Sequence, residues 1–448
     1  MKTRTESSKQ EKLERRIDAK SATVPQGVRP RVHFTAPYGW LNDPNGVCYY
    51  AGKYHLFFQY NPYGPRFGRM HWGHAVSNDL IRWQRRPVAL LPDKRYDWCG
   101  VWSGSAVEKD GELYAFYTAF GPLHRQALAV LQGDRFVKKG VVVRAGDLPL
   151  RGFHFNFRDP KVIPYRDGYL MAIGGNKNGH GACYFFRSQS LEKWEYAGML
   201  AFPELKGALE CPDIFEQDGR FAIMAGSTGA GAGNGRWYLY DAAPPDGGRL
   251  VASGHTDRGS AFYAAQSFEH DGRRIQHAWA RDGRPGTKKY GFAGLMNLPR
   301  EVTIENDALC FAPVREVWDY FQRDDAGALF AGCAKRCFCA KMRVCGGGCV
   351  VIQLLKSKGK DGLEIVLDFE KDSLRYSENG SIRAETALRE QAGADAVDVQ
   401  IIVDRCIAEV FVGKRTVFSY LNYEEGEAKS QITASGGAAV ECEFFSPR

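Results

Sequence analysis

Residues 43–60, DPNGVCYYAGKYHLFFQY, contain the pattern that decides the fold. A small or acidic residue comes first, then an apolar strand, a turn with glycine, and a second strand that carries aromatic residues. Short runs of Tyr, Phe, Val and Ile between Gly and Asp turns are typical of β-strands. Four later stretches repeat this plan. They are 103–120 (SGSAVEKDGELYAFYTAF), 159–175 (DPKVIPYRDGYLMAIGG), 212–227 (PDIFEQDGRFAIMAGS) and 264–280 (AAQSFEHDGRRIQHAWA).

The five stretches recur at similar intervals. With Asp43, Ser103, Asp159, Asp213 and Gln266 as markers, the successive intervals are 60, 56, 54 and 53 residues. A second phrase, S-x-x-L-x-x-W, begins at residue 77 and again at residue 188, an offset of 111 residues that is close to two intervals. Repeats of this size with several strands each are typical of propeller blades. We therefore predict a five-bladed β-propeller.

The chain divides into segments of different character. Residues 1–30 are polar and can form a short helix or stay loose, until prolines prevent a helix. The repeats occupy residues 31–305, the predicted catalytic domain. Residues 306–325 form a linker with a candidate short helix. Alternating strands such as DGLEIVLDF and AVDVQIIVD then predict an antiparallel β-sandwich over residues 326–448, so the expected fold class is all-β.

Composition limits the kind of protein. The 448 residues, 44% of them hydrophobic, are enough for the cores of two domains. The 60 Lys and Arg against 52 Asp and Glu give a net charge of +8, but they are spread along the chain, which does not indicate nucleic acid binding. No apolar run approaches the ~18 residues of a membrane helix, and the charged N-terminal segment does not resemble a secretory signal. We expect a cytoplasmic protein without nucleic acid or membrane partners, whose oligomeric state the sequence does not indicate.

The chain has twelve cysteines, which we expect to be free thiols in a reducing compartment. Five of them form a cluster that could be interpreted as a metal site: Cys333, Cys337, Cys339, Cys345 and Cys349. Their spacing fits no paired C-x-x-C zinc pattern, and the small residues between them suit a strand. We therefore expect no metal, and no nucleotide fingerprint indicates a cofactor.

Three carboxylates, Asp43, Asp159 and Glu210, occupy related places in the repeats together with Ser103. In a propeller the innermost strand of each blade lines the central channel, so these residues are expected to converge in one pocket. A single acid in a phrase such as DPNG is also a good turn former. Three acids at related places favour a catalytic role.

Paired carboxylates are what the cleavage of a glycosidic bond requires. One acid protonates the leaving oxygen, and the other attacks the anomeric carbon or activates water. Crowding of like charges also raises the pKa of one carboxyl, which gives an acid beside an ionised nucleophile. Trp40, Trp72 and Trp102 could stack on sugar rings, although packing in a core is the commoner role of an aromatic residue.

Seven motifs resemble glycoside hydrolase family 32, the invertase and sucrose-6-phosphate hydrolase family, and follow the order seen there. The motifs are GWLNDPNG, HLFFQYNP, HWGHAVSNDLIRW, WSGSAV, FRDPKV, ECPDIF and LPRE. The later phrase VDRCIAEVFV is similar to the sandwich domain of that family. The resemblance therefore covers nearly the whole chain and implies a β-fructofuranosidase.

The resemblance also implies roles for individual residues. Asp43 is expected to be the nucleophile that forms a covalent fructosyl-enzyme, and Glu210 the general acid that then acts as the base for water. Asp159, with Arg158, is expected to hold fructose hydroxyls and to stabilise an oxocarbenium-like transition state. The residues expected to bind substrate are Trp40, Leu41, Asn42, Gln59, Phe67, Trp72, Trp102, Ser103, Arg158 and Cys211.

At four positions the chain departs from the family pattern. The family commonly has Trp in place of Phe67, Phe in place of Trp102, Asp in place of Ala261, and in many members Trp in place of Leu209. The first two changes exchange one aromatic residue for another. The other two bear on substrate preference more than on reaction type.

Several activities remain open at this point. The leading prediction is hydrolysis of sucrose 6-phosphate or sucrose, with Arg66, Arg69 and His71 as candidate phosphate contacts or, equally, as a solvated basic loop. A fructosyltransferase or a fructan exo-hydrolase would use the same nucleophile. A carbohydrate-binding protein without catalysis is the alternative of another class.

Overall fold

The computed structural model describes residues 2–149, 156–229, 235–282, 286–325, 327, 329, 332–392, 396–424 and 426–448. Strands dominate these residues, which confirms the predicted all-β class. The helices are α1 (Lys2–Ser21) and the short α3 (Leu388–Ala392). The 3-10 helices are η1 (Gln26–Val28), η2 (Ala145–Asp147), η3 (Pro244–Asp246), η4 (Gly286–Tyr290) and η5 (Arg315–Tyr320).

Five sheets built from successive antiparallel strands follow one another along the chain up to residue 313. The first contains β1 (Gly39–Tyr50), β2 (Lys53–Asn61), β3 (His71–Ser77) and β4 (Trp83–Leu90), with β19 (Phe292–Ala293) paired parallel to β1. The second contains β5 (Gly100–Lys109), β6 (Glu112–Phe120), β7 (His124–Gln132) and β8 (Arg135–Arg144). The third contains β9 (Arg158–Tyr165), β10 (Gly168–Lys177), β11 (His180–Ser188) and β12 (Glu195–Lys206). The fourth contains β13 (Leu209–Gln217), β14 (Arg220–Ser227), β15 (Arg236–Tyr240) and β16 (Leu250–His255). The fifth contains β17 (Tyr263–His270), β18 (Arg273–Trp279), β20 (Arg300–Glu305) and β21 (Ala308–Pro313).

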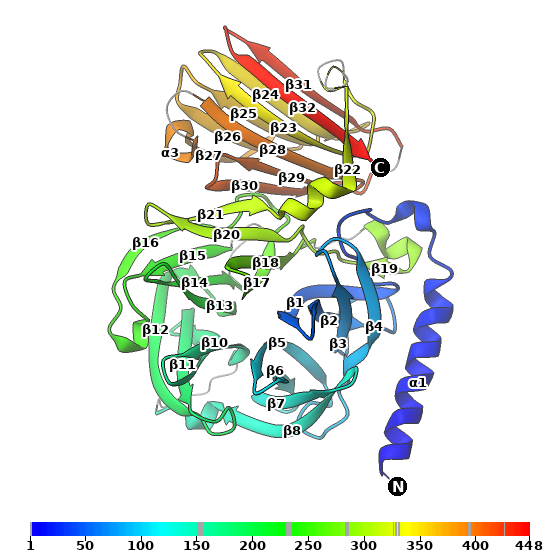
Figure 1. The fold of residues 1–448 in the computed structure, drawn as a ribbon, viewed down its shortest axis with the longest axis vertical. Coiled ribbons are helices and arrows are strands. Elements are labelled where there is room, and N and C mark those ends of the chain that lie inside the picture. The colour runs from blue at the N-terminus through cyan, green and yellow to red at the C-terminus, as the bar shows by residue number, and fades with distance from the viewer. Residues whose placement is uncertain are drawn as a thin grey trace.

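The first strands of these sheets form a closed ring. β1 contacts β5, β5 contacts β9, β9 contacts β13, β13 contacts β17, and β17 returns to β1. Figure 1 shows the sheets arranged around the axis that these inner strands surround. Apolar side chains fill the space between neighbouring sheets, as where Phe116 of the second sheet and Met171 of the third are both fully buried. The ring therefore brings the starts of five distant strands to one place.

The C-terminal part consists of two packed antiparallel sheets. One contains β22 (Phe321–Asp324), β32 (Ala439–Pro447), β23 (Cys337–Cys345), β28 (Ala396–Asp404), β29 (Ile407–Val412) and β30 (Thr416–Leu421). The other contains β27 (Ser381–Ala387), β26 (Ser373–Glu378), β25 (Leu363–Asp368), β24 (Cys349–Lys356) and β31 (Lys429–Ser435). Residues that alternate along these strands share one buried apolar cluster, which is typical of a β-sandwich.

Buried charges join the two parts of the chain. Arg300 of β20 contacts Asp257 at 2.8 Å and Glu409 of β29 at 2.6 Å, and all three side chains are excluded from solvent. His33 lies between Glu409, at 3.1 Å, and Asp404, at 2.9 Å. Although burial favours the neutral imidazole, the two carboxylates dominate and raise the pKa of His33 to about 9. Arg300 belongs to the LPRE motif, and Asp404 and Glu409 belong to VDRCIAEVFV, so residues of these two phrases meet where the two parts of the chain are in contact.

Helix α1 lies along the outside of the first sheet (Figure 1). Leu13 and Ile17, one turn apart, are buried in the core beneath it. The carboxylate of Glu14 accepts a hydrogen bond of 2.8 Å from the backbone N–H of Val88, and it pairs with Arg85. Of the two predictions for this polar segment, the helix is confirmed.

Candidate active site

A cavity of about 390 Å³ opens at one end of the ring of inner strands. Every one of the five sheets contributes side chains to its wall from its first strand. These side chains are Trp40, Asn42 and Asp43 from β1, Trp102 and Ser103 from β5, Arg158 and Asp159 from β9, Glu210 and Cys211 from β13, and Tyr263 from β17. The three predicted catalytic carboxylates are therefore brought together.

The inner strands share a backbone irregularity that directs these side chains into the cavity. In each of the five sheets, the pairing of the first strand with the second shifts its register near the cavity. The shifts lie between Leu41 and Pro44, Val101 and Gly104, Arg158 and Lys161, Glu210 and Asp213, and Tyr263 and Gln266. Asp159 and Cys211 also have left-handed φ angles of 64° and 49°. Bulges of this kind are common beside active sites because they turn a side chain away from the regular alternation.

Asp43 is held by hydrogen-bond donors. Ser103 donates its hydroxyl to Oδ2 of Asp43 at 2.7 Å, and the Cys211 thiol lies 3.7 Å from the same oxygen. Burial raises the pKa of Asp43, the donors oppose this shift, and the negative charge of Glu210 adds to it. The carboxylate is therefore oriented by a neighbouring strand while it remains open to the cavity.

Glu210 has both carboxyl oxygens engaged. Arg158 donates from Nη2 to Oε1 at 2.7 Å, and the phenol of Tyr263 donates to Oε2 at 2.5 Å. A side chain at residue 226 would collide with the Tyr263 ring, because a Cβ at Gly226 would lie 2.6 Å from it. Gly226 thus leaves the space that lets Tyr263 reach Glu210.

Asp159 is the most enclosed of the three acids. The backbone N–H of Cys211 donates to its Oδ2 at 3.0 Å, and Nε of Arg158 lies 3.8 Å from the same oxygen. Burial is the largest influence and raises the pKa of Asp159 to about 7; the charges of Glu210 and Asp43 act in the same direction, while Arg158 opposes them. Three coupled carboxylates with one guanidinium can hold protons unequally at neutral pH, as an acid and a nucleophile require.

Aromatic rings form the rest of the wall. Phe67 is 56% exposed at the rim and meets Trp40 and Trp102 edge to face, with ring centroids 6.5 Å and 6.4 Å apart. Trp279 packs against Trp40 at 6.1 Å on the other side. Such a wall offers both ring faces and edges to a sugar.

The structure separates the predicted substrate-binding residues into two groups. Eight of them line the cavity: Trp40, Asn42, Gln59, Phe67, Trp102, Ser103, Arg158 and Cys211. Leu41 and Trp72 do not, because both are fully buried in packed cores, where Trp72 donates its indole N–H to the backbone oxygen of Trp102 at 3.0 Å. Leu209 and Ala261, which depart from the family pattern, are also buried, and neither lines the active-site cavity.

Sequence reasoning missed five residues of the cavity. They are His124, Asn156, Tyr263, Trp279 and Arg281. Trp279 falls in the fifth repeat stretch, 264–280, and Tyr263 lies directly before it, after the phrase SAF. The sequence identifies both as aromatic residues of strands. Their spacing does not distinguish residues of the cavity wall from residues of the packed core.

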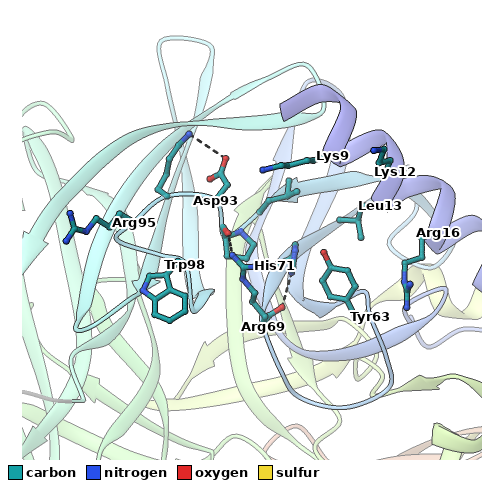
Figure 2. Close-up of a pocket in the computed structure, with 13 residues that line it drawn as sticks. Lys9, Lys12, Leu13, Arg16, Tyr63, Arg69, His71, Asp93, Arg95 and Trp98 are labelled. Atoms are coloured by element: carbon teal, nitrogen blue, oxygen red, sulfur yellow. Dashed lines mark hydrogen bonds and ion pairs between the residues drawn. The ribbon is translucent and has the colours of Figure 1, made fainter. Parts of the chain in front are cut away.

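None of the three candidate phosphate contacts lines the active-site cavity, and Arg66 lines neither that cavity nor the one described next. Arg69 and His71 line a second cavity of about 560 Å³, which helix α1 borders on one side with Lys9, Lys12 and Arg16 (Figure 2). No carboxylate of the active-site cavity belongs to its lining. Burial lowers the pKa of His71 to about 3, so this imidazole is neutral and offers no charge to a phosphate.

Among the described residues no group of His, Cys, Asp and Glu side chains could hold a metal ion. All twelve cysteines have free thiols. In the part of the chain that the structure describes, every helix is too short or too polar to cross a membrane.

Comparisons with known proteins identify relatives of this chain. The sequence model described as the N-terminal domain of glycosyl hydrolases family 32 matches residues 33–313. A sucrose-6-phosphate hydrolase of Escherichia coli is 31% identical over 456 residues, which cover 92% of this chain and 93% of that protein. The solved structure of a sucrose-6-phosphate hydrolase from Lactobacillus gasseri has a TM-score of 0.85 at 21% identity and covers 97% of this chain and 96% of its own. A mutant β-fructofuranosidase of Bombyx mori, solved with sucrose, has a TM-score of 0.81 at 24% identity and covers 97% of each chain.

A cavity with three converging carboxylates at the centre of this fold, together with these relatives, defines the protein as a glycoside hydrolase. The family match extends over more than half of the chain, and the similarity to the Escherichia coli protein over nearly all of it. The chain belongs to glycoside hydrolase family 32.

Proposed function

We propose that this chain hydrolyses terminal β-D-fructofuranosides with retention of configuration. The single observation that carries the proposal is the convergence of Asp43, Asp159 and Glu210 in one cavity. Two carboxylates in different hydrogen-bonding surroundings are what a retaining glycosidase needs.

In the first step, the carboxylate of Asp43 attacks the anomeric carbon of the fructosyl unit while Glu210 gives its proton to the leaving oxygen. The bond to the aglycone breaks and a covalent fructosyl-enzyme forms. In the second step, Glu210 takes a proton from water, and the water oxygen displaces Asp43. The hydrogen bond from Ser103 and the thiol of Cys211 orient Asp43 for the attack.

Asp159 and Arg158 bind and stabilise rather than transfer protons. Arg158 donates to Glu210 and lies next to Asp159, so it couples the charges of these two acids. Asp159 is placed to accept hydrogen bonds from fructose hydroxyls and to stabilise positive charge that develops on the ring. Trp40, Phe67 and Trp102 supply apolar surface for the sugar.

Sucrose and sucrose 6-phosphate are the proposed substrates. The similar proteins from Escherichia coli and Lactobacillus gasseri are sucrose-6-phosphate hydrolases, and the Bombyx mori structure contains sucrose. The cavity of about 390 Å³ has the size of a small-molecule site rather than of a groove for a long chain.

The finer description of the fold belongs to the same proposal. We propose a five-bladed β-propeller followed by a linker and a β-sandwich. The boundaries expected from the sequence, 31–305, 306–325 and 326–448, shift, because β21 (Ala308–Pro313) pairs within the fifth sheet and β22 (Phe321–Asp324) pairs with β32. The proposed propeller therefore extends to residue 313, and the proposed sandwich begins at residue 321. The closed ring of five inner strands supports the number of blades, and η5 lies in the proposed linker. We also propose the cytoplasm as the location, since a reducing compartment preserves twelve free thiols.

Release of reducing sugar from sucrose and sucrose 6-phosphate tests the proposal. We expect the parent to hydrolyse at least one of them, and Asp43→Asn and Glu210→Gln each to lower kcat at least about 1,000-fold, because each removes a group that reacts in the transition state. Circular dichroism of both variants serves as the control for folding.

Other outcomes would identify the alternatives. Oligofructosides formed at high sucrose without matching free fructose would indicate a transferase. Faster release of fructose from a short inulin-type oligomer than from sucrose would indicate a fructan exo-hydrolase. A folded parent that binds sucrose without turnover would indicate a carbohydrate-binding protein and contradict the proposal.

A further inference from the structure

Two hydrogen-bond donors at the end of β18 point to a ligand that the proposed catalytic groups do not need. Nε1 of Trp279 and Nη1 of Arg281 are both buried, and neither has a hydrogen-bond partner among the described residues. Both side chains line the active-site cavity. A buried donor without a partner costs about 1–3 kcal/mol, so a bound acceptor would stabilise this end of the cavity.

These donors lie on the side of the cavity where the leaving group departs. The guanidinium carbon of Arg281 is 4.4 Å from the centroid of the Tyr263 ring, and Trp279 meets the same ring edge to face at 6.4 Å. Tyr263 in turn donates to Glu210, the proposed acid. Because the acid protonates the leaving oxygen, the groups next to it face the aglycone and not the fructosyl unit.

The available charge at this side comes from Arg281. All three guanidinium nitrogens of Arg158 face protein acceptors, with Nη1 bonded to Asn156 at 2.8 Å, Nη2 to Glu210 at 2.7 Å, and Nε 3.8 Å from Asp159. Lys288 of η4 is a second nearby cation outside the lining, with its Nζ 5.8 Å from the centroid of the Trp40 ring. A phosphoryl group offers several acceptor oxygens and a negative charge to a guanidinium and an indole N–H, whereas a hydroxyl is neutral and offers a single acceptor atom.

We propose that Arg281, together with Trp279, binds a phosphate ester carried by the aglycone sugar and so determines the preference for sucrose 6-phosphate over sucrose. This inference rests on the proposed function and assigns its substrate preference to two residues that the sequence motifs did not identify. Arg281 is a specificity-determining residue here and takes no part in bond cleavage.

The basic cavity beside α1 is the competing location for a phosphate. Among the described residues its lining contains Arg69, five further Lys and Arg side chains and one acid, Asp93 (Figure 2). Asp93 contacts Lys94 and Lys138. It shares no lining residue with the catalytic cavity. Arg69→Gln is therefore a matched control for Arg281→Gln, since both remove one guanidinium that faces a cavity.

The test compares kcat/KM for sucrose 6-phosphate with kcat/KM for sucrose. We expect Arg281→Gln to lower this ratio about 10- to 100-fold, as the loss of a charge-assisted contact does. Arg281→Lys keeps the charge but not the planar guanidinium, so it should lower this ratio less than Arg281→Gln. Trp279→Phe keeps an aromatic ring but not the N–H, and should lower the ratio about 2- to 10-fold. Arg69→Gln should leave the ratio unchanged.

Inhibition by the products gives a second readout that does not depend on turnover of the ester. The inhibition constant of glucose 6-phosphate should rise about 10- to 100-fold in Arg281→Gln, and that of glucose less than about threefold. A parent that cleaves neither substrate contradicts the proposed function. If the parent cleaves both substrates, two results would overturn this inference alone. One is an unchanged kcat/KM ratio in Arg281→Gln, and the other is a lowered ratio in Arg69→Gln instead.

Discussion

Asp159→Asn should change how the stability of the protein depends on pH. The pKa of Asp159 is raised from 3.8 to about 7 in the folded protein, whereas the unfolded chain has the ordinary value. Between these values the folded state keeps a proton that the unfolded state has lost. The free energy of unfolding of the parent therefore falls as the pH rises from about 4 to about 7, and then stays lowered.

The size of the effect follows from the shift. A difference of about 3 pKa units at about 1.36 kcal/mol each corresponds to about 4 kcal/mol. Asparagine does not titrate in this range. The free energy of unfolding of Asp159→Asn, relative to that of the parent, should therefore rise by about 4 kcal/mol from pH 4 to pH 8. With an unfolding entropy of about 2.1 cal/mol/K per residue, this gain is a relative rise in Tm of about 4 °C.

Thermal unfolding followed by circular dichroism from pH 4 to pH 8 measures this difference. Asp218→Asn is the control, because Asp218 is exposed in the turn between β13 and β14 and its left-handed φ of 51° suits Asn equally well. Its Tm should stay at a constant offset from the parent. A constant offset for Asp159→Asn as well would refute the reasoning that burial and neighbouring acids hold a proton on Asp159.

Two further predictions concern single contacts. Tyr263→Phe removes the hydrogen bond to Glu210 and keeps the ring, so we expect kcat for fructose release to fall about 10-fold. The Tm should change little. An unchanged kcat would contradict a role for the phenol. Arg300→Met removes the guanidinium that pairs with the buried acids Asp257 and Glu409, and should lower the free energy of unfolding, measured in urea, by about 3–5 kcal/mol. Lys414→Met breaks an exposed ion pair and should lower this free energy by less than about 1 kcal/mol. Equal losses in the two variants would contradict this account.

The class of the fold could be predicted because the repeat is local. Each unit carries its own strands and turns, so the strand and turn patterns within each unit indicated the all-β class without any long-range information. The starts of those units became the cavity wall, which is why Asp43, Ser103, Asp159 and Glu210 were found from their position in the repeats. Helix α1 was harder to predict, since Leu13 and Ile17 are the large apolar residues on its described buried side and most of its sequence is polar.

The remaining wall residues could not be predicted because their roles depend on distances between sheets. Trp72 and Trp102 both lie in motifs that resemble the family, HWGHAVSNDLIRW and WSGSAV, yet Trp72 is buried in a core and Trp102 opens to the cavity. Arg281 lies after the end of a strand, and only the folded ring places it over Tyr263. The basic residues near position 69 show the same limit. The sequence gives their charge but not their distance from the three carboxylates.

The ion pairs between the two domains have a consequence for how this chain can change over evolutionary time. Arg300 and His33 lie before the junction, and Asp404 and Glu409 lie after it, more than 100 residues further along the chain. Loss of any one changes the balance of charge in a cluster that solvent does not reach, so a change at one position favours a compensating change at another. These four positions should therefore covary among homologues, and the sandwich of one relative should be exchangeable only with its matching partner residues.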